Sequence, residues 1–114
     1  LVPPEGGPPP HIHKREQESF YLLDGTLDIQ MGDTVVQAST GDFVHIPSGT
    51  VHCFRNTGKN TARMLLIFSP GGIERFFEET LDQVEDRTAD PPDNMDEVVA
   101  RYIEAAPRHG LHFV

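Results

Sequence analysis

Three histidines and one glutamate are spaced so that they could hold a metal ion. His11 and His13 are two residues apart, Glu18 follows on the same segment, and His52 lies well downstream. Three imidazoles and one carboxylate can bind a divalent first-row transition metal and leave coordination positions open. Imidazole nitrogen suits Fe, Ni, Cu and Zn, and the carboxylate also admits Mn. We therefore predict a metal centre at these four residues.

The two leading histidines have the spacing of a β-strand. Residues two apart on a strand share a face, with Cα atoms roughly 7 Å apart, so both imidazoles can meet at one ion. Glu18 lies an odd number of positions from His13, so an uninterrupted strand would send it to the opposite face. We therefore predict a bend or bulge in residues 14–17, of the kind common beside active sites. A turn at residues 47–49 should deliver His52 onto a new strand.

The two ligand-bearing segments resemble the two signature motifs of the cupin superfamily. Residues 11–25 read H-x-H-x4-E-x6-G, and residues 41–56 read G-x5-P-x-G-x2-H-x3-N. At average residue usage, the fixed positions of the second motif match by chance on the order of once in several million windows. The first motif departs once, because the family's leading glycine falls where this chain has Glu5. The resemblance implies an all-β double-stranded β-helix, the jelly-roll barrel of the cupins.

Short strands broken by turns agree with such a barrel over residues 1–70. Leu27, Ile29 and Met31 alternate with polar residues, which indicates a half-buried strand. Because the chain reaches His11 almost at once, we expect N-terminal strands of the barrel to be absent from this sequence. The strands are predicted at 19–24, 26–31, 34–38, 43–46, 51–56 and 62–69.

After residue 72 the apolar period becomes that of a helix. Apolar residues recur at helical spacing over 73–84 and again over 95–106, with a break at Asp90-Pro91-Pro92-Asp93 between them. We therefore predict a C-terminal extension of two α-helices over residues 71–114. Each helix carries one apolar stripe, which needs a partner surface. Packing on the outside of the barrel is the main prediction, and covering one mouth of the barrel is the alternative.

Composition and charge exclude several kinds of partner. The net charge is −9, with 18 acidic against 9 basic residues, and nucleic-acid binding needs a basic footprint. No apolar run approaches the ~20 residues of a membrane span, and no secretory signal is visible. We therefore expect no nucleic acid or membrane partner, and a cytoplasmic location. The single cysteine, Cys53, rules out an intramolecular disulfide and should be a buried thiol that faces away from the metal.

Residues that share a face with the ligands predict an apolar substrate pocket. Such a cavity fits a flat phenolic or a small lipophilic enol better than a sugar phosphate. The alternative is that these side chains are core filler, as is usual inside a small barrel. His45 lies at a position that the family does not use for metal, and Asn56 should hold a turn or strand end. The predicted lining residues are Phe20, Leu22, Phe43, Thr50, Phe54, Leu66 and Phe68.

The resemblance leaves three functions open. The Gly-Pro-Pro-Pro-His-Ile-His opening and the helical tail resemble those of quercetin dioxygenases, which implies a dioxygenase that consumes dioxygen and a small enolic or phenolic substrate. In those enzymes the residue equivalent to Glu18 is the base, and a carboxylate moved off the metal into an apolar cavity would have a raised pKa. The alternatives are a metal cupin with isomerase, lyase or decarboxylase chemistry, and a non-catalytic module that binds a small ligand.

The ligand set and the resemblance also bear on the metal and on the oligomeric state. Fe, Mn and Ni are the first candidates, and Zn, Co and Cu also accept this ligand set. Cupins tend to dimerise, so the resemblance implies a homodimer.

Overall fold

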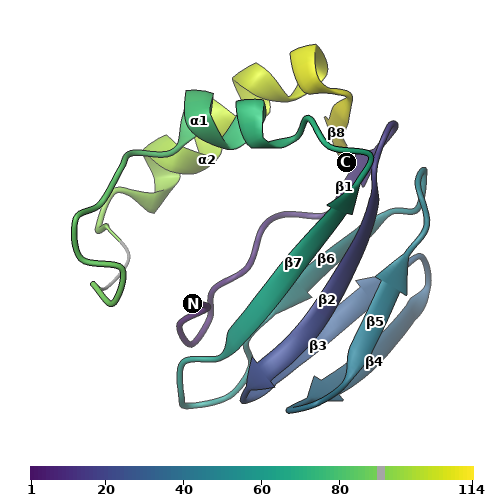
Figure 1. Cartoon of the computed structure of the whole chain (residues 1–114), viewed down its shortest axis with the longest axis vertical. Coiled ribbons are helices and arrows are strands. Elements are labelled where there is room, and N and C mark those ends of the chain that lie inside the picture. Colours follow the sequence, from purple (N-terminus) through teal and green to yellow (C-terminus); the bar gives the residue numbers. More distant parts are fainter. Residues whose placement is uncertain (90–91) are drawn as a thin grey trace.

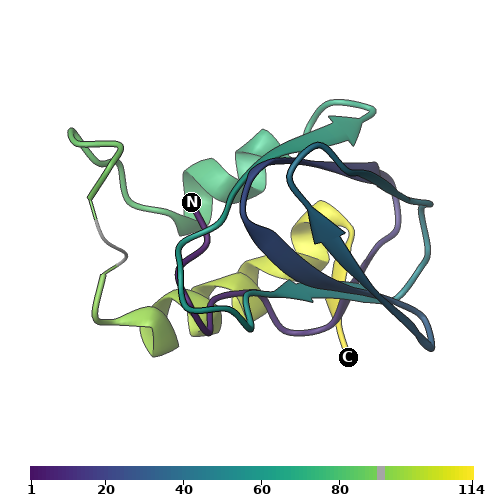
Figure 2. The same ribbon diagram turned by 90° about the horizontal axis from the view of Figure 1, so that it is seen from below.

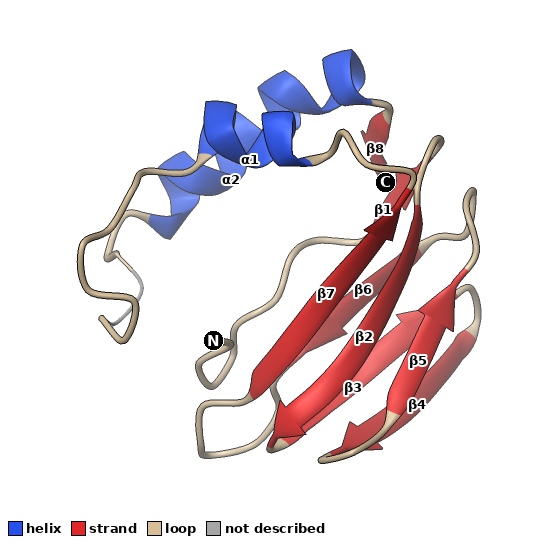
Figure 3. Cartoon of the chain, in the orientation of Figure 1, coloured by secondary structure: helices blue, strands red, loops and turns tan. Residues whose placement is uncertain are grey.

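Two β-sheets face each other in the computed structural model, which describes residues 1–89 and 92–114 (Figures 1 and 3). One sheet has the strand order β4-β3-β6-β1-β8 and the other the order β5-β2-β7. Asp90 and Pro91, part of the predicted break between the helices, lie outside the described residues. The strands are β1 (His11–His13), β2 (Gln17–Asp24), β3 (Thr26–Met31), β4 (Thr34–Ser39), β5 (Phe43–Ile46), β6 (His52–Arg55), β7 (Arg63–Ser69) and β8 (Leu111–Phe113).

The apolar side chains between the two sheets confirm the predicted fold class, a mostly β barrel followed by two helices. Successive side chains of a strand point to opposite faces, so every second residue enters the core. Phe20 and Leu22 enter it from β2, and Leu27 and Ile29 enter it from β3. The bounds of β3 and β5 are those predicted from the sequence, and the other predicted strands differ by one or two residues at either end.

Replacing Phe20 by alanine should test this core directly. The side chain is 0% exposed, so truncation leaves a cavity and should lower the free energy of unfolding by about 3–5 kcal/mol. Val35→Ala on β4 is the control, because Val35 is 64% exposed and its truncation should cost less than about 0.5 kcal/mol. Urea unfolding of the two variants beside the parent measures both values. Equal destabilisation by the two substitutions would contradict the burial of Phe20 in the core.

The chain changes sheet between the two halves of the first motif. β1 belongs to the five-stranded sheet and β2 to the three-stranded sheet, and Lys14, Arg15 and Glu16 connect them. The bend predicted after His13 is therefore confirmed. Its effect is larger than that of a bulge, because it moves the chain to the opposing sheet. The odd spacing of the motif then lets Glu18 face β1 across the interior.

The turn before β6 is fastened to β1 by hydrogen bonds. Gly49 has a φ of 81°, in the left-handed region that favours glycine, and its N–H donates to the carbonyl of His13 at 2.9 Å. The Ser48 hydroxyl donates to the same carbonyl at 3.2 Å. The second motif thus holds the strand that carries the candidate ligands His11 and His13.

The backbone conformation of Glu5 and the hydrogen bonds of Asn56 show what the two motifs require at these positions. Glu5, where the family has glycine, adopts a φ of 64°, and a non-glycine residue in that conformation costs roughly 1–2 kcal/mol. Asn56 is buried, and its side chain donates to the carbonyls of Val2 and Asn60, at 2.9 and 2.8 Å. Its side-chain oxygen accepts from the N–H of Gly58 at 2.9 Å. The prediction that Asn56 holds a turn is confirmed.

The C-terminal segment contains α1 (Glu74–Thr80), α2 (Met95–Ala105), the 3-10 helix η1 (Ala106–His109) and β8. β8 pairs antiparallel with β1, so the end of the chain is part of the barrel sheet as well as of the helical extension. A second apolar cluster joins these helices to β8, with Phe76 and Leu111 among its buried members. The end of α2 and η1 lie over one mouth of the barrel, as Figures 1 and 2 show together. Within the described residues, neither helix has the length and apolar character needed to cross a membrane.

Candidate metal centre

Four buried side chains converge inside the barrel, and they are the four predicted ligands. One donor atom from each of His11, His13, Glu18 and His52 lies within 4.8 Å of every other. The Nε2 atoms of His11 and His13 are 3.1 Å apart. Oε2 of Glu18 lies 2.6 Å from Nε2 of His52 and 3.2 Å from Nε2 of His13. The structure therefore brings all four predicted ligand residues to one point.

The pairing of strands explains this convergence. His11 on β1 lies directly opposite His52 on β6, so their imidazoles project from neighbouring positions of one sheet. Glu18 comes from β2 of the other sheet, where it lies between Ile46 on β5 and Phe68 on β7. Three nitrogen donors from one sheet thus meet one carboxylate from the facing sheet.

Backbone carbonyls orient two of the imidazoles. Nδ1 of His11 donates to the carbonyl of Pro9, and Nδ1 of His52 donates to that of Thr50, each at 2.8 Å. A proton on Nδ1 leaves the Nε2 lone pair free for an ion, and such partners are typical of metal-ligating histidines. The donor set and its supporting hydrogen bonds therefore fit a divalent transition metal.

Burial and hydrogen bonding set the charges of the cluster. Burial lowers the pKa of His11 to about 4, so His11 is neutral at pH 7. Burial alone would raise the pKa of Glu18, but hydrogen bonds from His13 and His52 outweigh it and lower that pKa to about 2. Burial likewise acts to lower the pKa of His52, and its hydrogen bond to Glu18 outweighs this and raises the pKa. The raised pKa predicted for Glu18 therefore does not apply while Glu18 contacts the imidazoles.

Metal affinity should fall on acidification. His52 has a pKa above 6.5, so below that pH a metal ion must displace its proton, whereas His11 and Glu18 are already deprotonated between pH 5 and 7. The apparent affinity should rise by up to about tenfold per pH unit over this range, because one proton leaves His52 for each ion bound. Chelator competition with Zn²⁺ at several pH values measures the slope. An affinity that does not change between pH 5 and 7 would contradict it.

Comparison with known proteins decides the family. The family model described as the cupin domain matches residues 1–68. This chain belongs to the cupin family. The cupin is 36% identical over 67 residues to a quercetin 2,3-dioxygenase of Bacillus subtilis, a match that covers 59% of this chain and 20% of that protein. It is 35% identical over 71 residues to a germin-like protein of Arabidopsis thaliana, covering 58% of this chain and 32% of the relative.

Solved structures agree with this assignment. The cupin superposes on a predicted oxalate decarboxylase from Thermotoga maritima with a TM-score of 0.56 and 28% identity, over 59% of this chain and 58% of that one. It also superposes on a recombinant oxalate oxidase with a TM-score of 0.54 and 30% identity, over 60% of this chain and 40% of that one. The chain thus spans only a part of these relatives.

The residues predicted to line a pocket have different environments in the cupin. Phe20 and Leu22 are fully buried in the core, and the ring of Phe54 packs against Phe20 at a centroid distance of 5.6 Å. Phe68 packs beside the imidazoles, with its ring 5.6 Å from that of His13. Thr50 contributes its backbone carbonyl, as the acceptor for His52. Phe20, Leu22 and Phe54 are therefore part of the core packing. Phe68 lies beside the candidate metal centre.

Two of the predicted lining residues are exposed. Phe43 is 59% exposed and lies opposite Tyr21 on the outer face of the sheet, so its placement in the pocket is wrong. The strand is only four residues long, and burial of Ile46 on the inner face fixes Phe43 on the outer one. Leu66 has the inward register of Phe20, yet it is 36% exposed because β7 is an edge strand.

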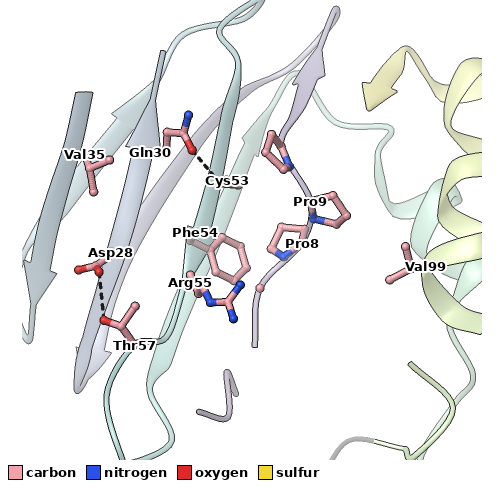
Figure 4. A pocket seen from close by; sticks show the side chains of 12 residues that line it. Pro8, Pro9, Asp28, Gln30, Val35, Cys53, Phe54, Arg55, Thr57 and Val99 are labelled. Atoms are coloured by element: carbon pink, nitrogen blue, oxygen red, sulfur yellow. Dashed lines mark hydrogen bonds between the residues drawn. The ribbon is translucent and has the colours of Figure 1, made fainter. Parts of the chain in front are cut away.

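A groove of about 500 Å³ lies on the outer side of β3 and β6 and was not predicted from the sequence (Figure 4). Pro8 and Pro9 form one wall, and Asp28, Cys53 and Arg55 contribute to another. Cys53 follows the inward-facing candidate ligand His52 on β6, so its side chain points away from the candidate metal centre, as predicted. The thiol is half-buried rather than fully buried, with Sγ 3.5 Å from the side-chain oxygen of Gln30.

His45 lies outside the cluster. It projects from the outer face of β5, where its Nδ1 lies 3.0 Å from the hydroxyl of Ser19. The register of β5 places His45 and the candidate ligand Glu18 on opposite faces of the three-stranded sheet, because Glu18 pairs with Ile46. The expectation that His45 is not a ligand agrees with this position.

Proposed function

We propose that this cupin binds one divalent transition metal at His11, His13, Glu18 and His52 and acts as a dioxygenase on a small enolic or phenolic substrate. The observation that carries the proposal is the convergence of three imidazole nitrogens and one carboxylate oxygen within 4.8 Å in the barrel interior. Similarity to a quercetin 2,3-dioxygenase supports the reaction class. Fe, Mn or Ni would suit a reaction with dioxygen, and Zn, Co or Cu would also fit the donors.

Each group at the site has a role in this proposal. A bound divalent metal would act as a Lewis acid toward the hydroxyl oxygen of the substrate. Glu18 is ionised in contact with His13 and His52. When it moves away from those imidazoles, burial raises its pKa, and the carboxylate can then take the proton of the substrate's hydroxyl. Phe68 and Phe113 flank the imidazoles of His13 and His11 and offer flat apolar contacts to an aromatic substrate.

Dioxygen uptake tests the proposal. The metal-loaded protein is mixed with a panel of flavonols and enediols in an oxygen electrode, beside protein stripped of metal by a chelator. Uptake that requires both metal and substrate supports a dioxygenase. Loaded protein that shows neither uptake nor turnover with any member of the panel would contradict this assignment for enolic and phenolic substrates.

A second candidate is a metal cupin that acts on a small carboxylate. Similarity at 28% and 30% identity to a predicted oxalate decarboxylase and to an oxalate oxidase favours it. Oxalate therefore belongs in the same panel. Turnover without dioxygen uptake would indicate isomerase, lyase or decarboxylase chemistry, and tight binding without turnover would indicate a binding module.

A homodimer is also proposed, and the outer face of the three-stranded sheet supports it. Tyr21 on β2 lies between Phe43 on β5 and Leu65 on β7, and all three side chains are exposed. Exposed apolar patches of this kind often mark interaction sites. Analytical ultracentrifugation at micromolar concentration should give twice the mass of one chain, and a monomer there would contradict the proposal.

A further inference from the structure

A buried acid outside the ligand set needs a physical explanation. Glu16 lies in the connection between β1 and β2 and is only 2% exposed. Its Oε2 atom is buried and has no hydrogen-bond partner among the described residues. A buried carboxylate oxygen without a partner costs free energy, so such groups usually have a role.

The atom that faces this oxygen belongs to a candidate metal ligand. Nδ1 of His13 lies 3.7 Å from Oε2 of Glu16 and, like it, is buried without a partner in the described part of the chain. The other two imidazoles are already supported, because His11 and His52 each donate from Nδ1 to a backbone carbonyl at 2.8 Å. His13 is thus the one imidazole of the cluster whose Nδ1 faces a carboxylate.

The tautomer of His13 connects these two unpartnered atoms. Nε2 of His13 points at Nε2 of His11 and at the carboxylate of Glu18, at 3.1 and 3.2 Å. To share an ion with them, Nε2 must present its lone pair, and the proton of a neutral imidazole must then be on Nδ1. The carboxylate of Glu16 is the acceptor that lies beside that proton. A shift of about 1 Å brings the pair to the 2.7–2.9 Å of a charge-assisted hydrogen bond.

We propose that Glu16 is a positioning residue for the metal centre, which accepts the Nδ1 proton of His13 and so fixes the tautomer and the ring of this ligand. This inference rests on the proposed metal site. A carboxylate acceptor raises the basicity of the imidazole more than a carbonyl does, so it strengthens the bond from Nε2 to the ion. The negative charge of Glu16 also matters. A divalent ion held by three neutral imidazoles and Glu18 keeps a net charge of about +1, which is costly in a buried site. The carboxylate of Glu16 brings the net charge of the site near zero.

Substitutions of Glu16 test the proposal through metal affinity rather than activity. Glu16→Ala removes the acceptor, and Glu16→Gln keeps a neutral acceptor of the same shape. Co²⁺ is the probe, because its visible absorption reports the ligand geometry and chelator competition gives its dissociation constant. Glu16→Ala should weaken Co²⁺ binding 10- to 100-fold and change the spectrum, and Glu16→Gln should have an intermediate effect. The control Glu78→Gln, an exposed position on α1, should bind as the parent does.

A second measurement separates positioning from folding. In the Zn²⁺-loaded protein, ¹⁵N NMR of the imidazoles should show the Nδ1 proton of His13, and Glu16→Gln should shift this signal while those of His11 and His52 stay in place. Thermal unfolding of the metal-free variants shows whether they are folded. If Glu16→Ala does not fold, Glu16→Gln still tests the role of Glu16.

The outcomes distinguish this inference from the proposed function. A parent protein that binds no Co²⁺ overturns the metal site and the role of Glu16 together. A parent that binds Co²⁺ no more tightly than folded Glu16→Ala and Glu16→Gln, with an unchanged spectrum, overturns only the role of Glu16. Weaker binding in both variants with an unshifted His13 signal also overturns the proposed hydrogen bond.

Discussion

Replacing His52 by alanine is expected to abolish stable metal loading. His52 lies opposite His11 across the β1–β6 pair, and its Nε2 is 2.6 Å from Glu18, so the substitution removes one of the four candidate donors. Four-ligand zinc sites in small domains have apparent binding free energies of about 10–16 kcal/mol, or about 2.5–4 kcal/mol per ligand. Loss of one ligand should therefore weaken binding roughly 100- to 1000-fold.

Elemental analysis of the purified, untagged protein measures this effect. The parent should carry close to one equivalent of a transition metal, and His52→Ala should retain less than about a tenth of it after dialysis, as the weakened affinity requires. His45→Ala is the matched control, because His45 is on the outer face of the barrel and away from the cluster. Equal metal in the parent and in His52→Ala would show that the ion is bound elsewhere.

Glu18→Gln is expected to abolish turnover while leaving much of the metal in place. The amide keeps an oxygen that can ligate weakly, but it cannot take a proton from a substrate. General-base catalysis contributes about 10²- to 10⁴-fold, so dioxygen uptake per bound metal should fall by at least about 100-fold. Uptake must be divided by measured metal content, since the variant has lost the negative charge of Glu18 and should load less fully.

The uptake measurement on Glu18→Gln needs one control, and one result would contradict the role of Glu18 as the base. Glu78→Gln makes the same chemical change at an exposed position and should leave uptake unchanged. If Glu18→Gln keeps both full metal loading and full activity, Glu18 is not the base. Its role would then be limited to ordering the imidazoles of His13 and His52, which both contact it in the structure.

The ligand cluster could be predicted from the sequence because two local motifs determine it. Residues 11–25 and 41–56 each place their ligands by short-range geometry, and strand pairing then follows from the alternation of apolar residues. The pairing of His11 with His52 is long-range, but the order of strands in the cupin barrel implies it. For this reason the convergence of the four side chains followed from the family resemblance.

Other features depend on tertiary contacts that leave no local pattern. Glu16 lies in a run of charged residues that is typical of an exposed loop, and only the crossing between sheets buries it. Phe43 has as much apolar character as Ile46, so a four-residue strand gives no local reason to choose which of them faces inward. The strand Leu111–Phe113 is too short for a periodic signal, and its pairing with β1 depends on where the helices place it.

The pairing of β8 with β1 bears on how an ion would reach the site. His11 lies opposite Phe113 and His13 lies opposite Leu111, so β8 pairs along the whole of β1, the strand that carries two candidate ligands. A three-residue edge strand can open by local unfolding at a small fraction of the free energy of global unfolding. Each opening would uncover the imidazole of His11, against which Phe113 packs at 5.5 Å. The tail would then act as a kinetic gate, and its truncation should speed the exchange of bound metal more than it changes the equilibrium affinity.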